Sequence, residues 1–295
     1  MLSRKLKELS SGIIIRFALI FINFITFFIA IVLLLKSRPI LKYHKISELL
    51  LSVNWHPIKN EFGFFPFIIG TIEITAIAMI LSVPLCILCA IYISEYAKKR
   101  IREIIHLTID ILAGIPSVIY GLFGVIAVVP FVKVFGNLIG VETTGYSLLS
   151  GGIILAIMVC PVIISVTLEV FKAIPQPARE SSLALGTTRW ETIRHVLLKS
   201  ARRGILAAIV LGFARAFGET IAVMMVVGNV PKIPKSLFDP AYPLPALIAN
   251  NYGEMLSIPL YDSALLFAAF ILMLVVGFFS LLANITLLKI ERGGV

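Results

Sequence analysis

The chain has 295 residues, of which 59% are hydrophobic and 14% are charged, and its mean hydropathy is +1.02. Soluble domains are about 45–50% apolar and about 25% charged, so this composition excludes a water-soluble globule. The formal net charge of +10 is compatible with a nucleic-acid partner. In a membrane protein, however, lysine and arginine first indicate which loops stay in the cytoplasm, and we expect no nucleic acid here.

Six apolar stretches are each long enough to cross a hydrocarbon core of about 30 Å as a helix that rises about 1.5 Å per residue. They are residues 17–35, 64–93, 104–132, 148–168, 205–228 and 264–288. The first stretch is too long for a secretory signal and no small-residue cleavage site follows it, so we expect an uncleaved anchor. Pro84, Pro116 and Pro161 are expected to kink the helices that contain them. The sequence predicts an all-α, polytopic membrane protein with six transmembrane helices.

Lysine and arginine are distributed unequally between the loops on the two sides of these predicted spans. One side holds 17 of them and the other holds eight. Because cytoplasmic loops carry the basic excess, this asymmetry predicts that both termini and the loop 171–203 are cytoplasmic. The loops 36–63, 133–147 and 229–263 are then outside.

The cysteines give no sign of a metal or redox site. Cys86, Cys89 and Cys160 lie in apolar stretches, and the Cys86-x-x-Cys89 pair has no second pair or histidine nearby, so we expect them to pack in the interior. No HExxH spacing and no Gly-x-x-x-x-Gly-Lys phosphate loop occurs in the sequence. If the protein uses ATP, we expect another subunit to bind it.

The longest cytoplasmic loop, 171–203, has the pattern of a helical hairpin. Pro177 suits the first turn of a helix, and Gly186 suits its left-handed end. Thr188 and Glu191 have the spacing of a capping box that starts a second helix. On periodicity alone, an equally good interpretation is a basic amphipathic segment at the lipid headgroups.

The segment ESSLALG at 180–186, followed by Val-x-Leu at 196–198, resembles the coupling loop of ABC-importer permeases. Three residues depart from the family pattern, where two alanines and a proline are replaced by Ser181, Ser182 and Lys199. In that family the loop docks into a cleft of a separate ATPase. The resemblance implies that Glu180 and Gly186 serve ATPase coupling.

Two charged residues, Arg215 and Glu219, lie within the predicted span 205–228. A charged side chain at mid-bilayer costs about 2.5–3.5 kcal/mol on insertion scales, so each one requires a functional explanation. On a helical wheel both share an arc with small residues, namely Gly204, Ala208, Gly212 and Ala222, whereas large apolar residues fill the opposite arc. We expect both charges to point into the protein, either lining a path or locking helices together as an i, i+4 pair.

Other candidates for buried ionisable or polar groups lie in the second and third spans. They are Glu73 and Asp110, together with Ser117 and Tyr120, whose hydroxyls follow a kink expected at Pro116. An equally good interpretation of this region is helix packing through Gly114, Gly121 and Gly124. Asp110 is also compatible with simple solvation near the cytoplasmic side.

The string RAFGETIAVMMVVGN at 215–229, taken with AGIPSVIYGLFG at 113–124, Ser94-Glu95-Tyr96 and the coupling loop, resembles the PstC family of phosphate-specific ABC permease subunits. The resemblance covers roughly residues 54–262. It implies the type I fold of ABC importer permeases, with 1–295 as a single transmembrane domain. Within it, about 64–288 is the core, and 1–63 is an anchor helix with an outer loop.

The same resemblance implies a function and a set of partners. The chain is expected to be the membrane subunit of an ATP-driven, binding-protein-dependent importer of inorganic phosphate, and not itself an enzyme. The implied partners are a second permease subunit (PstA-like), an ATP-binding subunit dimer (PstB-like), an extracytoplasmic phosphate-binding protein (PstS-like) and membrane lipid. The implied substrate-path residues are Arg215, Glu219, Asp110 and Ser117.

Phosphate fits this assignment chemically, because a guanidinium group can bind two phosphate oxygens at once. Glu219 would then moderate the attraction, so that the ion is not trapped. Two alternatives remain open: an ABC permease for another oxyanion such as molybdate or sulfate, and a secondary anion transporter, in which the loop 171–203 has no docking role. A membrane-embedded enzyme would need a nucleophile–base or metal set, and the sequence displays none.

Overall fold

The computed structural model describes residues 2–254 and 258–292. These residues are almost all helical, and the sheet within them is one two-stranded hairpin, so the predicted all-α class is confirmed. The basic residues counted at the two ends lie outside the described side chains; they are Arg4, Lys5, Lys7, Arg16, Lys289 and Arg292.

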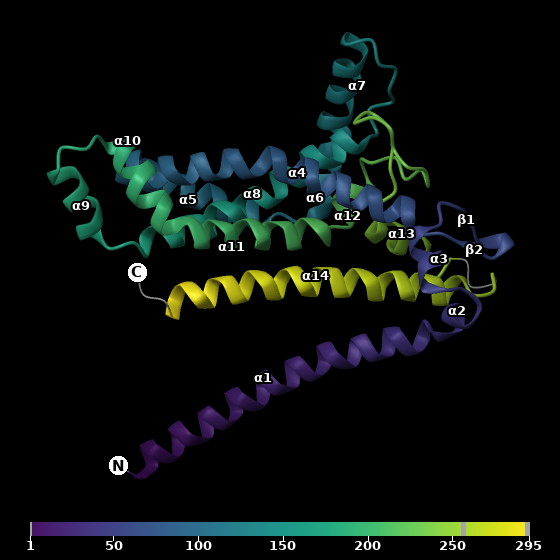
Figure 1. Cartoon of the computed structure of the whole chain (residues 1–295), viewed down its shortest axis with the longest axis horizontal. Helices are drawn as coiled ribbons and strands as arrows, with labels where there is room; N and C mark the ends of the chain where they lie inside the picture. Colours follow the sequence, from purple (N-terminus) through teal and green to yellow (C-terminus); the bar gives the residue numbers. More distant parts are fainter. Residues whose placement is uncertain (1, 255–257, 293–295) are drawn as a thin grey trace.

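Long helices run side by side in the centre of the molecule (Figure 1). Helices α4 (Phe65–Ile91) and α8 (Leu148–Lys172) pack along one another, and α11 (Leu198–Phe217) packs against both. Helix α14 (Tyr261–Arg292) covers α11, and α1 (Leu2–Lys36) contacts α14. The predicted spans 64–93, 148–168 and 264–288 thus correspond to helices.

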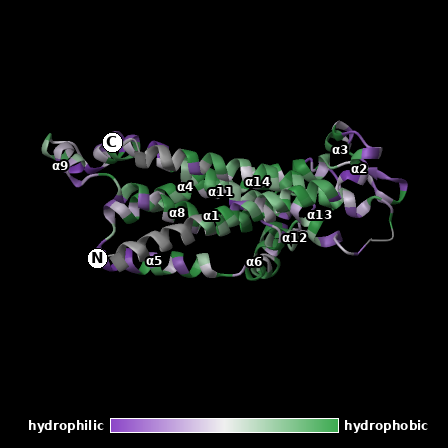
Figure 2. Cartoon of the chain, turned by 90° about the horizontal axis from the view of Figure 1, so that it is seen from below, coloured by the Kyte–Doolittle hydropathy of each residue, from purple (hydrophilic) through white to green (hydrophobic). Residues whose placement is uncertain are grey.

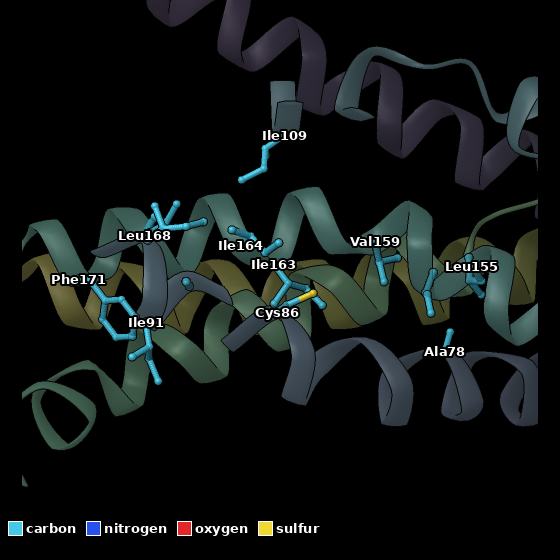
Figure 3. Close-up of a cluster of buried hydrophobic side chains, with 14 of the residues drawn as sticks. Ala78, Cys86, Ile91, Ile109, Leu155, Val159, Ile163, Ile164, Leu168 and Phe171 are labelled. Atoms are coloured by element: carbon cyan, nitrogen blue, oxygen red, sulfur yellow. The ribbon is translucent and has the colours of Figure 1, made fainter. Parts of the chain in front are cut away.

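The interface between α4 and α8 forms the main core. Figure 3 shows Ala78 and Cys86 of α4 beside Leu155, Val159 and Ile163 of α8, and all five are nearly or fully buried. Their burial and the apolar composition of the helices stabilise the packing. Cys86, Cys89 and Cys160 are free thiols, in agreement with the predicted packing role.

Small residues let the helices approach closely. An added Cβ at Gly212 of α11 would lie 2.7 Å from Cγ1 of Ile163, and one at Gly204 would overlap the side chain of Val170. Gly152 of α8 has the same relation to Ile77 of α4. Glycine at these positions is therefore a packing requirement, as expected where helices associate without a hydrophobic gain.

The predicted third span, 104–132, is wrong as one continuous helix. Helix α5 (Lys99–Gly114) ends before Ile115, whose ψ of 127° is extended, and α6 (Ser117–Phe123) begins after Pro116. Helix α6 continues through a π-helical turn (Gly124–Val128) into α7 (Val129–Leu138). The physical reason is Pro116, which disfavours the helical conformation of the preceding residue and lacks a backbone donor. Helices α4 and α8, in contrast, continue through Pro84 and Pro161.

The predicted fifth span, 205–228, is also interrupted. Helix α11 ends at Phe217, and the short α12 (Ile221–Met224) follows after a break at Gly218, Glu219 and Thr220. At its other end α11 is continuous with α10 (Arg189–Thr192) through a π-helical turn (Ile193–Leu197). Glycine destabilises a helix interior, which explains why the apolar pattern did not give one helix.

Within the described residues, four helical segments are long and apolar enough to cross a membrane. They are Phe65–Tyr96, Ser117–Leu138, Leu148–Lys172 and Tyr261–Leu282, and Ile20–Lys36 is a shorter apolar helix. The predicted count of six is therefore not confirmed. The predicted span 205–228 is not among these segments, because the first half of α11 carries basic residues and the helix stops at the break.

The two ends of the bundle differ. At one end the loop predicted at 36–63 folds into α2 (Arg38–Tyr43), α3 (Ile46–Leu51) and a hairpin of β1 (Trp55–His56) and β2 (Glu61–Phe62) around a 3-10 turn, Pro57–Lys59. Helix α13 (Leu244–Asn251) lies nearby. At the other end are α9 (Gln176–Ala184) and α10, together with the start of α1 and the end of α14 (Figure 1). Hydrophobic residues occupy the middle of the bundle, and hydrophilic ones gather towards the ends (Figure 2).

Candidate functional site: a break between two helices and a helical hairpin

The break between α11 and α12 separates the two predicted path residues. Arg215 lies in the last turn of α11 and is exposed, whereas Glu219 lies within the break and is half-buried. No ion pair joins them in the part of the chain that the structure describes. Instead, Oε1 of Glu219 accepts a long hydrogen bond of 3.4 Å from the backbone nitrogen of Ala222. Arg215 therefore does not point into the core of this chain. The predicted i, i+4 pair with Glu219 is not formed, because α11 ends at Phe217.

The small residues of the predicted arc nevertheless lie where the wheel puts them. Gly204, Ala208, Gly212 and Ala222 are all buried. The arc assumes an uninterrupted helix, and it predicts the burial of Gly204, Ala208 and Gly212 correctly because α11 is a regular helix at these turns. Ala222 lies in α12 and is buried for a different reason, since α12 packs against α6.

Helix α6 brings a second predicted segment next to the motif that begins at Arg215, because α6 packs against α12. The Tyr120 hydroxyl of α6 donates a hydrogen bond of 2.8 Å to the carbonyl of Leu112. The segment 113–124 and the motif that begins at Arg215 therefore meet in space. Sequence spacing had suggested hydroxyl donors here and is confirmed for Tyr120.

Gly121 and Gly124 serve close packing, as one sequence interpretation proposed. An added Cβ at Gly121 would lie 3.2 Å from Cα of Ala222 and would overlap the sulfur of Met225. One at Gly124 would lie 2.6 Å from Cγ1 of Val226. Gly114 is different, because no atom lies within 4 Å of an added Cβ there.

The remaining candidates are distributed around the break between α5 and α6. Asp110 is exposed on α5, one turn before the helix ends, and Ser117 is the half-buried first residue of α6. Glu73 is half-buried on α4, and its Oε2 atom is buried without a hydrogen-bond partner. The substrate role of Asp110 and Ser117 stays a prediction.

An open pocket of about 560 Å³ lies beyond α12. Its lining comprises Thr144, Tyr146, Met224, Met225, Gly228, Asn229, Val230 and Pro240. Asn229 has a left-handed backbone (φ 53°), and its Nδ2 donates a 2.8 Å hydrogen bond to the Met224 carbonyl, while its Oδ1 is buried without a partner. The sequence analysis does not identify Asn229 as a pocket residue. The Gly228-Asn229 dipeptide does indicate a left-handed turn, because both residue types favour positive φ.

The helical hairpin at the other end has the predicted local structure. Pro177 lies in the first turn of α9, and Gly186 has φ 82° directly after the helix end. Thr188 and Glu191 form the predicted capping box, with Thr188 Oγ1 accepting from the Glu191 nitrogen at 3.2 Å and Glu191 Oε2 accepting from the Thr188 nitrogen at 2.7 Å. The Thr188 nitrogen and hydroxyl both donate to the Glu191 carboxylate, and these two bonds lower the pKa of Glu191 below its ordinary value.

A triangle of hydroxyl groups closes the hairpin around Gly186. The hydroxyl oxygens of Ser182, Thr187 and Thr192 lie 2.9, 3.1 and 3.0 Å from one another. Thr187 Oγ1 also donates to the Ser182 carbonyl at 2.7 Å. Ser182 is one of the residues that depart from the family pattern, and the structure gives it a role that alanine could not fill.

The outer face of the hairpin carries the predicted coupling residues and several uncovered apolar side chains. Glu180 and Gly186 are exposed. Beside them Leu183, Leu185 and Trp190 are 47%, 86% and 50% exposed. A group of exposed large apolar residues on a polar end of the molecule is typical of a protein–protein contact.

The long apolar helices define the molecule as a multi-pass membrane protein. The family model of binding-protein-dependent transport system inner membrane components matches residues 82–289. The chain belongs to this family.

Relatives with assigned names are similar over most of the chain. The phosphate transport system permease protein PstC of Xylella fastidiosa (strain 9a5c) is 36% identical over 82% of this chain and 78% of its own. A probable phosphate transport system permease protein PstC of Methanocaldococcus jannaschii is 32% identical over 94% of this chain and 92% of its own. The probable ABC transporter permease protein YqgH of Bacillus subtilis (strain 168) is 41% identical over 70% of this chain and 66% of its own length.

Solved structures support the fold alone. A crystal structure of an amino acid ABC transporter with histidines superposes with a TM-score of 0.51 at 17% identity, and the match covers 75% of this chain and 91% of that chain. The expected fold of an ABC importer permease is therefore confirmed at the level of architecture.

Proposed function

We propose that this chain is the transmembrane permease subunit of an ATP-driven, binding-protein-dependent importer of inorganic phosphate. The observation that carries the proposal is the similarity to named phosphate permeases, which reaches 36% identity over 82% of the chain. It forms the translocation path with a second permease subunit, which is PstA-like. A PstB-like subunit dimer binds and hydrolyses ATP, and a PstS-like extracytoplasmic protein delivers phosphate.

The path runs past the break between α11 and α12. Arg215 supports this proposal because it is exposed in the last turn of α11, and its planar guanidinium group can bind two phosphate oxygens. Asp110, Ser117 and Glu219 complete the proposed path. Glu219 adds a negative charge just beyond the break, so that the ion is bound weakly enough to leave.

The hairpin of α9 and α10 is the proposed docking element for the ATP-binding subunit. Its exposed Leu183, Leu185 and Trp190 offer an apolar contact, while Glu180 supplies a charged group beside them. Gly186 provides the left-handed turn that sets the two short helices at their angle.

The proposed orientation places both termini and the hairpin in the cytoplasm. Two observations support it: the 17 to eight distribution of lysine and arginine, and the position of the hairpin at the same end of the bundle as the start of α1 and the end of α14 (Figure 1).

Uptake into proteoliposomes tests the substrate and the mechanism together. The complex is reconstituted with its binding protein outside and ATP inside, and uptake of labelled phosphate is measured with excess sulfate or molybdate. We expect ATP-dependent phosphate uptake that neither competitor reduces. Uptake without ATP or an ATP-binding subunit would indicate a secondary transporter, and strong competition would indicate another oxyanion.

A pair of variants tests Arg215 itself. Arg215→Lys keeps the charge and loses the two-pronged donor set, so we expect assembled complex with poor phosphate uptake. The double change Arg215→Gln with Glu219→Gln removes both charges and is expected to transport poorly as well. Robust uptake by the neutral double variant would exclude Arg215 as a phosphate contact.

A further inference from the structure

The turn that continues α4 beyond Ile91, which carries Ser94, Glu95 and Tyr96, is contacted by arginines from three other elements. Arg102 of α5 donates from Nε to the Ile93 carbonyl at 3.1 Å and from Nη2 to the Ser94 carbonyl at 2.9 Å. The turn itself is π-helical, Tyr92–Tyr96, and such turns are often found at functional positions.

The second arginine, Arg179, belongs to the hairpin helix α9. Its Nε lies 3.4 Å from Oε1 of Glu95, and the two side chains are only 17% and 15% exposed. Ser94 Oγ donates to the same Glu95 oxygen at 2.8 Å, which holds the carboxylate in place. The Arg179 guanidinium also donates from Nη1 and Nη2 to the Ile174 and Phe171 carbonyls, at 3.0 and 2.6 Å.

The third arginine, Arg189, belongs to the other short helix of the hairpin. Its guanidinium carbon lies 5.4 Å from the centre of the Tyr96 ring, within the range of a cation–π contact. Both α9 and α10 therefore contact adjacent residues of the same α4 turn.

Helix α9 has few other attachments to the bundle. It has no buried residue, its main contacts are with α10 and the π-helical turn that follows, and Ala178 packs against the main core. Arg179 contacts carbonyls at the end of α8 and the Glu95 carboxylate, whereas Glu180, the next residue, is exposed. A displacement of α9 therefore has a charged contact with the turn that continues α4, beside the packing of Ala178.

Helix α4 is suited to carry such a displacement. It extends from the Ser94–Tyr96 turn along the whole bundle, packs against α8 and α11, and reaches the aromatic cluster at the other end, where Phe67 lies 5.0 Å from the Trp55 ring. A close-packed helix moves as a rigid element, because the packing at its sides resists local deformation.

We propose that the ion pair between Arg179 and Glu95 joins the coupling hairpin to α4, so that movement of the docked ATPase reaches the membrane helices through α4. This inference rests on the proposed function, since it requires an ATPase at the hairpin. Arg179 and Glu95 are positioning residues: they transmit displacement and contact no phosphate. The cation–π contact of Arg189 with Tyr96 is a second, weaker contact between the same hairpin and the same turn.

The test compares phosphate transported with ATP hydrolysed in the reconstituted complex. Glu95→Gln removes the ion pair with almost no change in shape, and Arg179 keeps its two carbonyl acceptors. We expect the ATP-binding subunit to copurify and binding-protein-stimulated hydrolysis to continue, while phosphate transported per ATP falls about fivefold or more, as for a coupling free energy of ordinary size. Glu95→Asp, which keeps the charge, should restore part of the ratio.

The matched control is Glu169→Gln. Glu169 pairs with Lys172 at 2.7 Å within α8, close to the hairpin, but this exposed pair joins no two elements. We expect its transport ratio to be that of the unchanged protein. An unchanged ratio for Glu95→Gln would overturn the inference, and so would loss of the ATP-binding subunit from that variant, because the pair would then serve only to fold the docking surface. Absence of phosphate uptake or of ATPase association in the unchanged protein would instead refute the proposed function.

Discussion

The Tyr120 hydroxyl donates its hydrogen bond to the Leu112 carbonyl across the break that Pro116 makes between α5 and α6. In a continuous helix this carbonyl would accept from the backbone nitrogen of residue 116, and proline has no hydrogen there. Tyr120 therefore replaces the bond that the proline removes, beside a longer bond of 3.3 Å from the Ile115 nitrogen to the same carbonyl. In a bilayer this replacement matters, because no water is present to satisfy the carbonyl.

Removing that donor should destabilise the break. In Tyr120→Phe the Leu112 carbonyl loses its side-chain partner and keeps only the long bond from the Ile115 nitrogen, so we expect the free energy of unfolding to fall by about 0.5–1.5 kcal/mol. A lower thermal denaturation midpoint of the detergent-solubilised protein would report this loss. Tyr92→Phe is the control, since Tyr92 is exposed. Equal midpoints for both variants would contradict this role of Tyr120.

The proposed orientation predicts which hairpin turn faces the cytoplasm. Ile58, in the turn between β1 and β2, and Leu185, in the turn after α9, are 88% and 86% exposed, at opposite ends of the bundle (Figure 1). In a background in which the native cysteines are replaced by alanine, Ile58→Cys should react with a membrane-impermeant maleimide in intact cells. Leu185→Cys should react only after the membrane is opened. Reaction of both in intact cells would refute the orientation.

Gly186 should be sensitive to substitution because of its backbone and not because of space. No atom lies within 4 Å of an added Cβ, but φ is 82°, and an L-residue there costs about 1–2 kcal/mol. We expect Gly186→Ala to reduce copurification of the ATP-binding subunit and phosphate uptake, and Gly186→Asn to reduce them less. Gly114→Ala is the control, because its Cβ also meets open space without a positive φ. Equal effects of the two alanine variants would refute the conformational explanation.

The capping box should weaken in acid. Hydrogen bonds from Thr188 lower the pKa of Glu191, so the contribution of the charged cap is complete above the ordinary pKa and is lost as the pH falls through the lowered value. Amide exchange protection of residues 188–192, corrected for the intrinsic pH dependence, should decrease in that range. Glu191→Gln can still cap the helix without titrating, and its protection should stay constant. The same decrease in that variant would exclude Glu191 as the titrating group.

Thr188 provides the complementary test of the same cap. Thr188→Ala removes the side-chain acceptor of the Glu191 nitrogen, and loss of an N-cap costs about 1 kcal/mol. Exchange at residues 189–192 should therefore accelerate, while exchange in the core helix α8 stays unchanged. Equal protection in the variant and the unchanged protein would show that the neighbouring turns hold this helix start without the cap.

Local signals were sufficient for much of the molecule. The apolar runs predicted α4, α8 and α14 because a helix in a membrane satisfies its own backbone groups whatever surrounds it. The hairpin was predictable for a similar reason: the capping box and the left-handed Gly186 act within a few residues of one another. The fold class needed no more than this.

The tertiary structure decided which interruptions become breaks. Pro84 and Pro161 lie inside α4 and α8, which pack against each other and remain continuous, whereas Pro116 separates α5 from α6, where Tyr120 satisfies the freed carbonyl. The apolar pattern at 205–228 likewise did not reveal the break at Gly218. A helical wheel assumes an unbroken helix, so it placed Arg215 and Glu219 on the same helix face. Because α11 ends at Phe217, the two residues do not share a helix.

The sequence by itself determined the membrane class, the main helices and the hairpin, because hydrophobic periodicity and capping act between neighbouring residues. Only the tertiary structure decided that Gly121 lies beside Ala222 and that Arg179 lies beside Glu95. Each of these pairs joins residues far apart in the chain, and their proximity depends on how α4, α6, α8 and α11 pack. Packing of that kind is set by the shapes of many side chains at once, which no spacing rule in a single sequence encodes.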